Sequence, residues 1–521
     1  MRRGLVVIAI LACLWPLLEA RETQGRIQGA ELINGLDVSN YKVSYFYGRD
    51  EADWVTDVPA SEAVARQTVR DALAPLALAH STWLGGYGDD WGIAIASNAT
   101  GIYIAGMTLS RDFPPDSATS PRKDAFVTKL SADGKSLIYT AFFPLGMLSI
   151  NKYLGLAVDD KGSVFLAGNT NSRTFPIKNA FQSTIGGGID GFILKIFPSG
   201  KGIIYSSYLG GSAEDCCCAL TLEASGIAHP GGYTMSSNFP VVNPFQSRLR
   251  GKMDAFVSRV SADGKTLLAS TYLGGTGAEM CRDLALDAAG ADYAIGWSSS
   301  KDFPVKSGVQ MTFGGNQDAF VTKFPAADLS RLSYSTYLGG GSRDDGGGVD
   351  VDGTGAVYAV GYTQGEFPTV NAFQKTRKGN SEAFVAKIDP AGAKLIFSTY
   401  LGGVSIDIAS DVRVDAAGSA IVVGFTRSRA FPVRNAYQAA MMGSSDAFLT
   451  IFSADGKKLL LSTFLGGTYS EQGIGLFLDA EEDILLTGLT ESPDFPTAGS
   501  FQKKHAGGYD AFALKFRRAA D

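Results

Sequence analysis

Residues 270–275 read STYLGG, residues 302–304 read DFP, and residues 318–323 read DAFVTK. Each of these short motifs recurs along the chain at a nearly fixed interval. The Phe of the Phe-Pro pair stands at positions 113, 175, 239, 303, 367, 431 and 495, with spacings of 62 and then 64 five times. Such a fixed period predicts an array of equal structural units.

The other two motifs keep the same register. An acidic residue lies two positions before a Phe in every copy: Asp124, Asp190, Asp254, Asp318, Glu382, Asp446 and Asp510. The Leu of the STYLGG-type segment recurs at Leu84, Leu209, Leu273, Leu338, Leu401 and Leu465, and residues 141–146 (AFFPLG) are a degenerate copy. The sequence therefore contains seven repeats.

Each repeat contains four strand-like runs. In the fifth repeat they cover residues 348–352, 356–362, 382–388 and 394–401, which we name strands a, b, c and d. These runs are rich in Val, Ile, Tyr and Phe and are bounded by Gly and Asp, as strands are. Four strands in about 64 residues are typical of a β-propeller blade.

The chain ends favour a closed ring. The last repeat stops with a c strand at residues 510–516, and an additional d strand at residues 76–84 precedes the first repeat. If the N-terminal strand completes the last blade, the ring closes without open sheet edges. We expect an all-β, seven-bladed β-propeller over residues 76–518.

These motifs resemble those of the seven-bladed β-propeller (SBBP-type) repeat family of secreted bacterial proteins. Residues 40–59, which include YFYG at 45–48 and WVTDVP at 54–59, are similar to part of a β-rich domain that often precedes such propellers. That domain is much longer in the family, so residues 21–75 resemble a truncated remnant of it. The resemblance implies an extracytoplasmic propeller and no particular activity.

The first 20 residues are typical of a secretory signal. Arg2 and Arg3 precede an apolar run, and Ala20 ends it at a suitable cleavage position. Lipid anchoring at Cys13 is an alternative. We expect a secreted, periplasmic or cell-surface protein, with no membrane span in the mature chain. The net charge of −6 argues against nucleic acid as a partner.

The repeated acidic residues of strand c have two interpretations. They form a cation-binding ring, or each accepts hydrogen bonds from backbone N–H groups where the long b–c loop enters its strand. Their equal use in every repeat favours the second. Likewise, we expect each Phe of a Phe-Pro pair to fill the gap between neighbouring blades. The Asp-Gly pairs at Asp133, Asp263 and Asp455 predict tight c–d turns.

We predict ligand binding on the face that carries the d–a and b–c loops, because variable loops on a fixed scaffold usually bind. The candidate residues are the carboxylates of the d–a loops: Asp89, Asp90, Glu214, Asp215, Glu279, Asp344, Asp345, Asp407 and Glu471. We expect no cofactor. Ca²⁺ is the one cation that such carboxylates suit, although the spacing of a calcium loop is missing.

The cysteines and histidines give weaker signals. Cys217 and Cys281 are 64 residues apart, so they hold equivalent positions on adjacent blades, where they are a candidate disulfide or simply small buried residues. The triplet 216–218 is also a remote candidate for metal binding. His229, with Pro230 and Gly231, replaces a regular b strand in the third repeat, and neither it nor His80 or His505 predicts a catalytic triad.

Two functions follow from this pattern. The first is a monomeric binding or scaffold propeller that docks an extracellular glycan, protein or surface polymer on its long-loop face. The alternative is a propeller enzyme, a glycan hydrolase or lyase with paired carboxylates in the central funnel. No catalytic residue is identified, and the arrangement of the funnel is the feature that discriminates between the two.

Overall fold

The computed structural model describes residues 32–33, 36–37, 76–113, 124–146 and 153–518. The chain divides into two compact units, Met1–Ala74 and Pro75–Asp521. In the first unit, β1 (Leu32–Ile33) pairs antiparallel with β2 (Leu36–Asp37). The signal-like segment and most of residues 21–75 lie outside the described residues.

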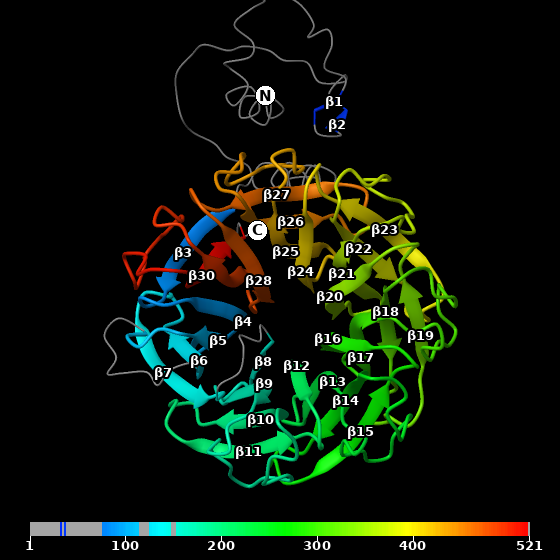
Figure 1. Ribbon diagram of the computed structural model, residues 1–521. Coiled ribbons are helices and arrows are strands. Elements are labelled where there is room, and N and C mark those ends of the chain that lie inside the picture. Colours follow the sequence, from blue (N-terminus) through cyan, green and yellow to red (C-terminus); the bar gives the residue numbers. More distant parts are fainter. Residues whose placement is uncertain (1–31, 34–35, 38–75, 114–123, 147–152, 519–521) are drawn as a thin grey trace, which may run out of the picture. The chain divides into compact units, whose positions relative to one another are not determined.

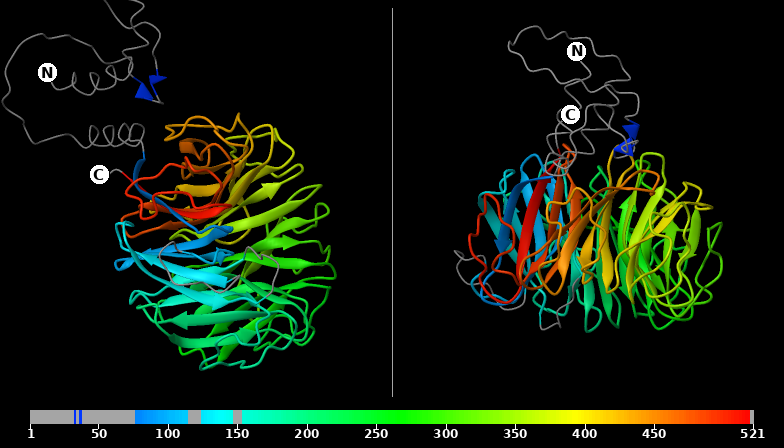
Figure 2. Two further views of the ribbon diagram at one scale, coloured as in Figure 1. Left: turned by 60° about the vertical axis from the view of Figure 1, so that its left-hand side comes forward. Right: turned by 90° about the horizontal axis from the view of Figure 1, so that it is seen from above.

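The second unit is a ring of seven four-stranded antiparallel sheets around a central axis (Figure 1). The described residues contain strands and turns only. This confirms the predicted all-β, seven-bladed β-propeller. In the edge-on view of Figure 2, the strands run between two faces of the ring, which carry the connecting loops.

We number the blades along the chain. Blade 1 contains β4 (Asp90–Asn98), β5 (Gly101–Thr108), β6 (Asp124–Leu130) and β7 (Leu137–Pro144). Blade 2 contains β8 (Gly155–Val158), β9 (Val164–Thr170), β10 (Asp190–Ile196) and β11 (Ile203–Leu209). Blade 3 contains β12 (Asp215–Leu222), β13 (Ala228–Thr234), β14 (Asp254–Val260) and β15 (Leu267–Leu273).

Blade 4 contains β16 (Glu279–Leu286), β17 (Asp292–Ser298), β18 (Asp318–Lys323) and β19 (Tyr334–Leu338). Blade 5 contains β20 (Asp344–Val351), β21 (Val357–Thr363), β22 (Glu382–Ile388) and β23 (Leu395–Leu401). Blade 6 contains β24 (Asp407–Val414), β25 (Ala420–Thr426), β26 (Asp446–Phe452) and β27 (Leu459–Leu465).

Blade 7 combines the two ends of the second unit. It contains β28 (Glu471–Leu478), β29 (Ile484–Thr490), β30 (Asp510–Arg517) and β3 (Ala77–Leu84). β3 pairs antiparallel with β30 from Ala77↔Arg517 to Leu84↔Ala511. The predicted closure by the N-terminal strand is therefore confirmed, and every d strand has a c strand as its partner.

Buried aromatic residues fill the space between the sheets. Each Phe of a Phe-Pro pair is at most 6% exposed and packs on the Phe of strand c, with ring centroids 4.4–4.7 Å apart. Phe175, for example, belongs to a cluster with Trp91 and Met107 of blade 1 and Phe192 of blade 2. The expected packing role of these residues between neighbouring blades is borne out.

Two local expectations are corrected. Strand a of the fifth repeat begins at Asp344 rather than at Gly348, because a β-bulge between Gly346 and Gly348 interrupts the pattern. The b strand of the third repeat is intact: β13 pairs with β12 over its whole length, and only its pairing with β14 is interrupted beside His229 and Pro230. Pro230 has no N–H group to donate to β14, which explains the interruption of this pairing.

Candidate binding site at the axis of the ring

The acidic residues of strand c cap the b–c loops. Asp254 accepts hydrogen bonds from the backbone N–H groups of Arg250 and Gly251 and from Nε2 of Gln246, and Asp318 and Asp446 have the same set of partners. Apart from Asp124, whose side chain is outside the description, these residues support the capping interpretation.

A repeated glutamine, overlooked in the sequence, completes this cap. It lies eight residues before the acidic residue, at Gln182, Gln246, Gln310, Gln374, Gln438 and Gln502. In blade 3, Nε2 of Gln246 donates to Asp254, while Oε1 accepts the N–H of Gly274 at the end of β15. The fixed spacing of 64 residues is the signal that identifies it.

Six of the nine predicted binding carboxylates are the first residues of strand a: Asp90, Asp215, Glu279, Asp344, Asp407 and Glu471. All six are fully buried. Glu279 accepts hydrogen bonds from the N–H of Gly275 and from the hydroxyls of Ser298 and Ser300. These six side chains therefore fold the d–a turn instead of facing a ligand.

Burial perturbs the titration of these carboxyls. It raises the pKa of Asp90, Asp215 and Asp344 to about 6, and hydrogen bonds from the turn oppose the shift. It raises the pKa of Glu279 and Glu471 to about 7 and also raises the pKa of Asp407. The cause is structural, so the raised pKa values do not by themselves indicate catalysis.

The other three candidates lie apart from one another. Asp89 accepts the N–H of Tyr509 in blade 7. Glu214 accepts the hydroxyl of Tyr233 at 2.6 Å. Only Asp345, 3% exposed, has side-chain partners from neighbouring blades.

Cys217 and Cys281 are separate in the structure, where the four cysteines of the described residues are all free. A Cβ on Gly191 of blade 2 would touch Sγ of Cys217, whereas one on Gly231 of blade 3 would touch Sγ of Cys281. Equivalent residues related by rotation point the same way round the ring, so each faces the preceding blade. The proposed disulfide is therefore not formed here.

Strand a is the innermost strand of every blade, so its residues line the axis (Figure 1). A β-bulge interrupts this strand at the same place in six blades, and the bulged residues are Ile93, Cys218, Arg282, Gly347, Ser410 and Ile474. Bulges redirect side chains and often border functional sites. Chemically diverse residues at one structural position make the axis asymmetric.

Arg282 forms the centre of the polar sector of this axis. Its Nη1 donates to the hydroxyl of Tyr153 in blade 2 at 2.5 Å, and its Nη2 lies 3.2 Å from Oδ2 of Asp345 in blade 5. Arg343 also approaches Asp345, at 3.6 Å, and lies over the ring of Tyr362. Two guanidinium groups thus lie beside one carboxylate.

Donors and aromatic faces accompany these guanidinium groups. Trp297 lies beside the a strand of blade 4, partly exposed, and Tyr153 and Tyr362 are partly exposed as well. Nε1 of Trp297 and Nε of Arg282 have no acceptor among the described residues. Guanidinium groups, N–H donors and aromatic faces together suit a ligand that carries acceptor oxygens.

Three carboxylates elsewhere at the axis connect adjacent blades. Asp283, Asp350 and Asp411 accept the backbone N–H groups of Val349, Val414 and Leu476, each on the a strand of the next blade. Burial raises the pKa of all three, and the nearby guanidinium of Arg413 opposes the shift. Because they satisfy the free edge of strand a, we interpret them as structural.

His229 occupies a buried ion-pair network instead of a catalytic site. Its Nδ1 lies 2.5 Å from Asp292 of blade 4, and its Nε2 lies 3.0 Å from Glu223, which also pairs with Arg259. Neighbouring blades have an aromatic ring at this register position, covered by a lysine, as in Phe165 under Lys195. His229 therefore replaces a packing residue.

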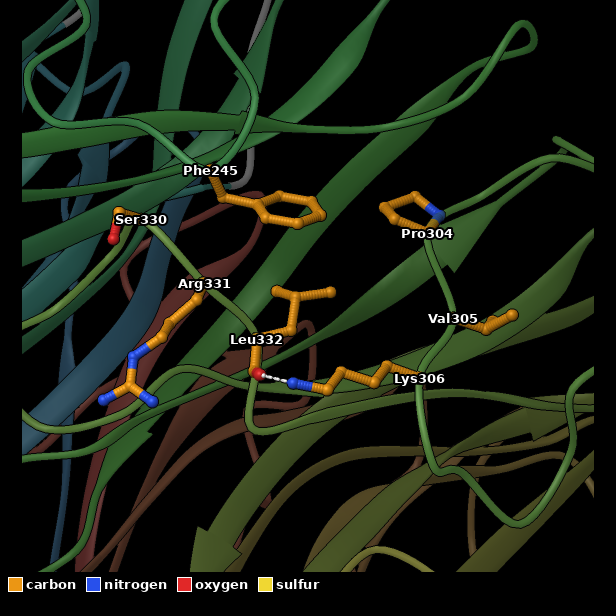
Figure 3. A pocket seen from close by; sticks show the side chains of 7 residues that line it. All are labelled: Phe245, Pro304, Val305, Lys306, Ser330, Arg331 and Leu332. Atoms are coloured by element: carbon orange, nitrogen blue, oxygen red, sulfur yellow. Dashed lines mark hydrogen bonds between the residues drawn. The ribbon is translucent and has the colours of Figure 1, made fainter.

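A surface pocket between blades 3 and 4 lies away from the axis. It is lined by Phe245 and by two segments of blade 4, residues 304–306 and 330–332 (Figure 3). Nζ of Lys306 donates to the carbonyl oxygen of Leu332 at 2.5 Å, and the N–H of Phe245 donates to the carbonyl of Leu329. Its polar groups are used internally, so we assign it no role in binding.

Neither a metal centre nor a membrane helix is evident in the described ranges. Within them, no cluster of three or more His, Cys, Asp or Glu side chains is arranged to hold a metal ion. The same residues include no helix long and apolar enough to cross a membrane.

Comparisons with solved structures give distant similarities. The chain is similar to a protein of unknown function from Dyadobacter fermentans (12% identity, TM-score 0.41, covering 86% of this chain and 100% of that one). It is also similar to a europium-containing methanol dehydrogenase (10%, 0.38, 84% and 93%) and to BamB from Moraxella catarrhalis (10%, 0.34, 85% and 100%).

No family model matches the chain, and no curated protein matches it. At these identities and TM-scores the solved structures add nothing about function. The structure shows a seven-bladed β-propeller fold. The resemblance of the motifs to the SBBP-type repeat family is an expectation from the sequence.

Proposed function

We propose that this protein is an extracytoplasmic binding propeller that docks an acidic glycan on its long-loop face, over the axial ends of blades 2 to 5. The observation that carries the proposal is the polar sector around Arg282. It brings together residues of blades 2, 4 and 5, and its central residue, Arg282, stands at the bulge position where other blades have Ile, Cys, Ser or Gly.

The chemistry of this sector suits acidic sugars. Arg282 and Arg343 supply two guanidinium groups, and a guanidinium recognises a carboxylate through paired N–H donors. Tyr153, Trp297 and Tyr362 supply aromatic surface beside it. Proteins and other surface polymers with exposed carboxylates present the same groups, and they are the other ligands to test.

The test is a glycan array followed by calorimetry on the glycans that bind. We expect Arg282→Ala and Tyr362→Ala each to weaken binding at least about tenfold, as residues at the centre of a binding site do. Ser410→Ala is the matched control, because Ser410 holds the bulge position of Arg282 in blade 6. Equal affinity in all three variants, or no binding of acidic glycans, would reject the proposal.

The same experiment decides the enzymatic alternative. Reducing ends and unsaturated products are measured in the wells that contain bound glycan. A binding protein releases neither over long incubation. Product release that disappears in an Asp345→Asn variant would assign hydrolase or lyase activity to the axis instead.

A further inference from the structure

The start of β12 brings two thiols into contact. Sγ of Cys216 and Sγ of Cys218 are 3.5 Å apart. In a regular strand, residues i and i+2 are separated by about 6.6 Å along the chain. The β-bulge between Cys217 and Ala219 changes the direction of Cys218 and accounts for the short distance.

A thioether belongs to the same cluster. Cys216, Cys218, Tyr233 and Met280 pack together, with Met253, Tyr153 and Trp297 against them. Cys216 is fully buried, Cys218 is 6% exposed and Met280 is 4% exposed. Two thiols and a thioether in a largely apolar setting form a donor set of soft sulfur atoms.

We propose that Cys216, Cys218 and Met280 form a binding site for a soft monovalent metal ion of the Cu⁺ type. Thiolate and thioether ligands select Cu⁺, whereas Ca²⁺ and Mg²⁺ require oxygen ligands. A structural zinc site needs four ligands, and the described residues supply no fourth cysteine or histidine here. The sulfur set therefore fits a cation of low coordination number.

The charge balance of binding is also met. Coordination of Cu⁺ by two thiolates releases two protons to solvent and forms two S–Cu bonds, which leaves the complex with one negative charge. The guanidinium of Arg282 lies near this cluster, because its Nη1 donates to the hydroxyl of Tyr153, which packs against the cluster. Arg282 is thus an outer partner that stabilises the anionic complex.

The test is anaerobic titration of the reduced, full-length protein with Cu⁺ in the presence of a competing chelator. We expect one ion per chain, and a sulfur shell of two or three atoms by X-ray absorption. Cys216→Ser and Cys218→Ser should weaken binding by more than about 100-fold, the upper end of what loss of an outer partner costs. Met280→Leu should weaken binding and keep the fold.

The control is Cys217→Ser, which removes the cysteine between the two ligands. Sγ of Cys217 lies against Gly191 of blade 2, so this variant should bind Cu⁺ as the wild type does. Melting curves identify any variant that fails to fold, and Cys216→Ala and Cys218→Ala then replace it. No binding, a shell of nitrogen or oxygen only, or equal binding by the Cys216→Ser and Cys218→Ser variants would overturn the proposal.

Discussion

Two sets of residues on the long-loop face differ in how they recur from blade to blade. At the blade junctions, the strand-c carboxylate recurs in all seven blades, and the strand-a carboxylate and the glutamine each recur in six. At the bulge of strand a, by contrast, the residue differs between most blades, from Ile93 through Cys218 and Arg282 to Ser410. Residues that hold the ring repeat with it, whereas residues that recognise one ligand have no reason to repeat.

The largest effect should follow removal of the closing strand. Deletion of residues 76–84 exposes the edge of β30 and leaves Leu514 and Phe512 without their cover. We expect loss of the folded monomer, seen by size-exclusion chromatography and circular dichroism. Deletion of residues 21–75 is the control and should leave a folded ring.

His229 departs from the repeat, because neighbouring blades have an aromatic residue at its position, so its replacement tests the buried pair with Asp292. His229→Phe restores the aromatic residue of neighbouring blades but leaves Asp292 buried without its partner. We expect a loss of about 3–5 kcal/mol in the free energy of unfolding, as for other broken buried pairs. Chemical denaturation measures it.

The double variant His229→Phe/Asp292→Val should recover most of that loss. Blade 2 has Phe165 at the register position of His229 and Val164 at that of Asp292, so each new residue already occurs at its position in another blade. Strictly additive losses in the two single variants would contradict a direct His229–Asp292 coupling.

Two glycines of one d–a turn differ in the space available for a side chain, and substitution by alanine compares them. A Cβ on Gly339 would lie 2.6 Å from Oδ2 of Asp344 and 3.0 Å from Cγ of Asp318. Gly339→Ala should therefore cost about 1–3 kcal/mol through overpacking. In the same turn Gly341 has nothing within 4 Å, so Gly341→Ala should be neutral in the same denaturation experiment.

A further prediction concerns pH. Glu279 and Glu471 have folded-state pKa values of about 7 against the ordinary 4.5, so the folded chain binds more protons than the unfolded chain between these values. Their stabilising contribution is present below pH 4.5 and is lost as the pH rises through 7.

Calorimetry at pH 5 and pH 8 checks this. We expect the melting temperature to be several degrees higher at pH 5, and the difference to shrink in Glu279→Gln/Glu471→Gln. A melting temperature that rises towards pH 8 would contradict the assignment of burial as the dominant cause.

The sequence predicts the ring well because its signals repeat. The Phe-Pro pairs, the acidic residues of strand c and the lone d strand before Leu84 give the number of blades and the closure. The a strands are predicted less accurately. Glycine in β20 conceals the alternation of side chains, and a bulge shifts its phase.

The candidate site is predicted only in part. The sequence places Asp345 and the other carboxylates of the d–a loops on the long-loop face. It does not reveal that Asp90 and Glu279 accept hydrogen bonds within their own turns. It also does not pair Arg282 with Tyr153, because these residues are 129 positions apart and meet only when the ring is closed. The same holds for the bulge that brings Cys216 and Cys218 together.

The pairing of Leu84 with Ala511 sets an order on folding. When the ribosome has made six blades, β3 still has no sheet to join, because its partner β30 has not been synthesised. Contacts between distant parts of a chain form slowly, and unpaired strand edges associate with other chains. The synthesis of β30 therefore decides when the ring can close and the nascent chain stops being vulnerable to aggregation.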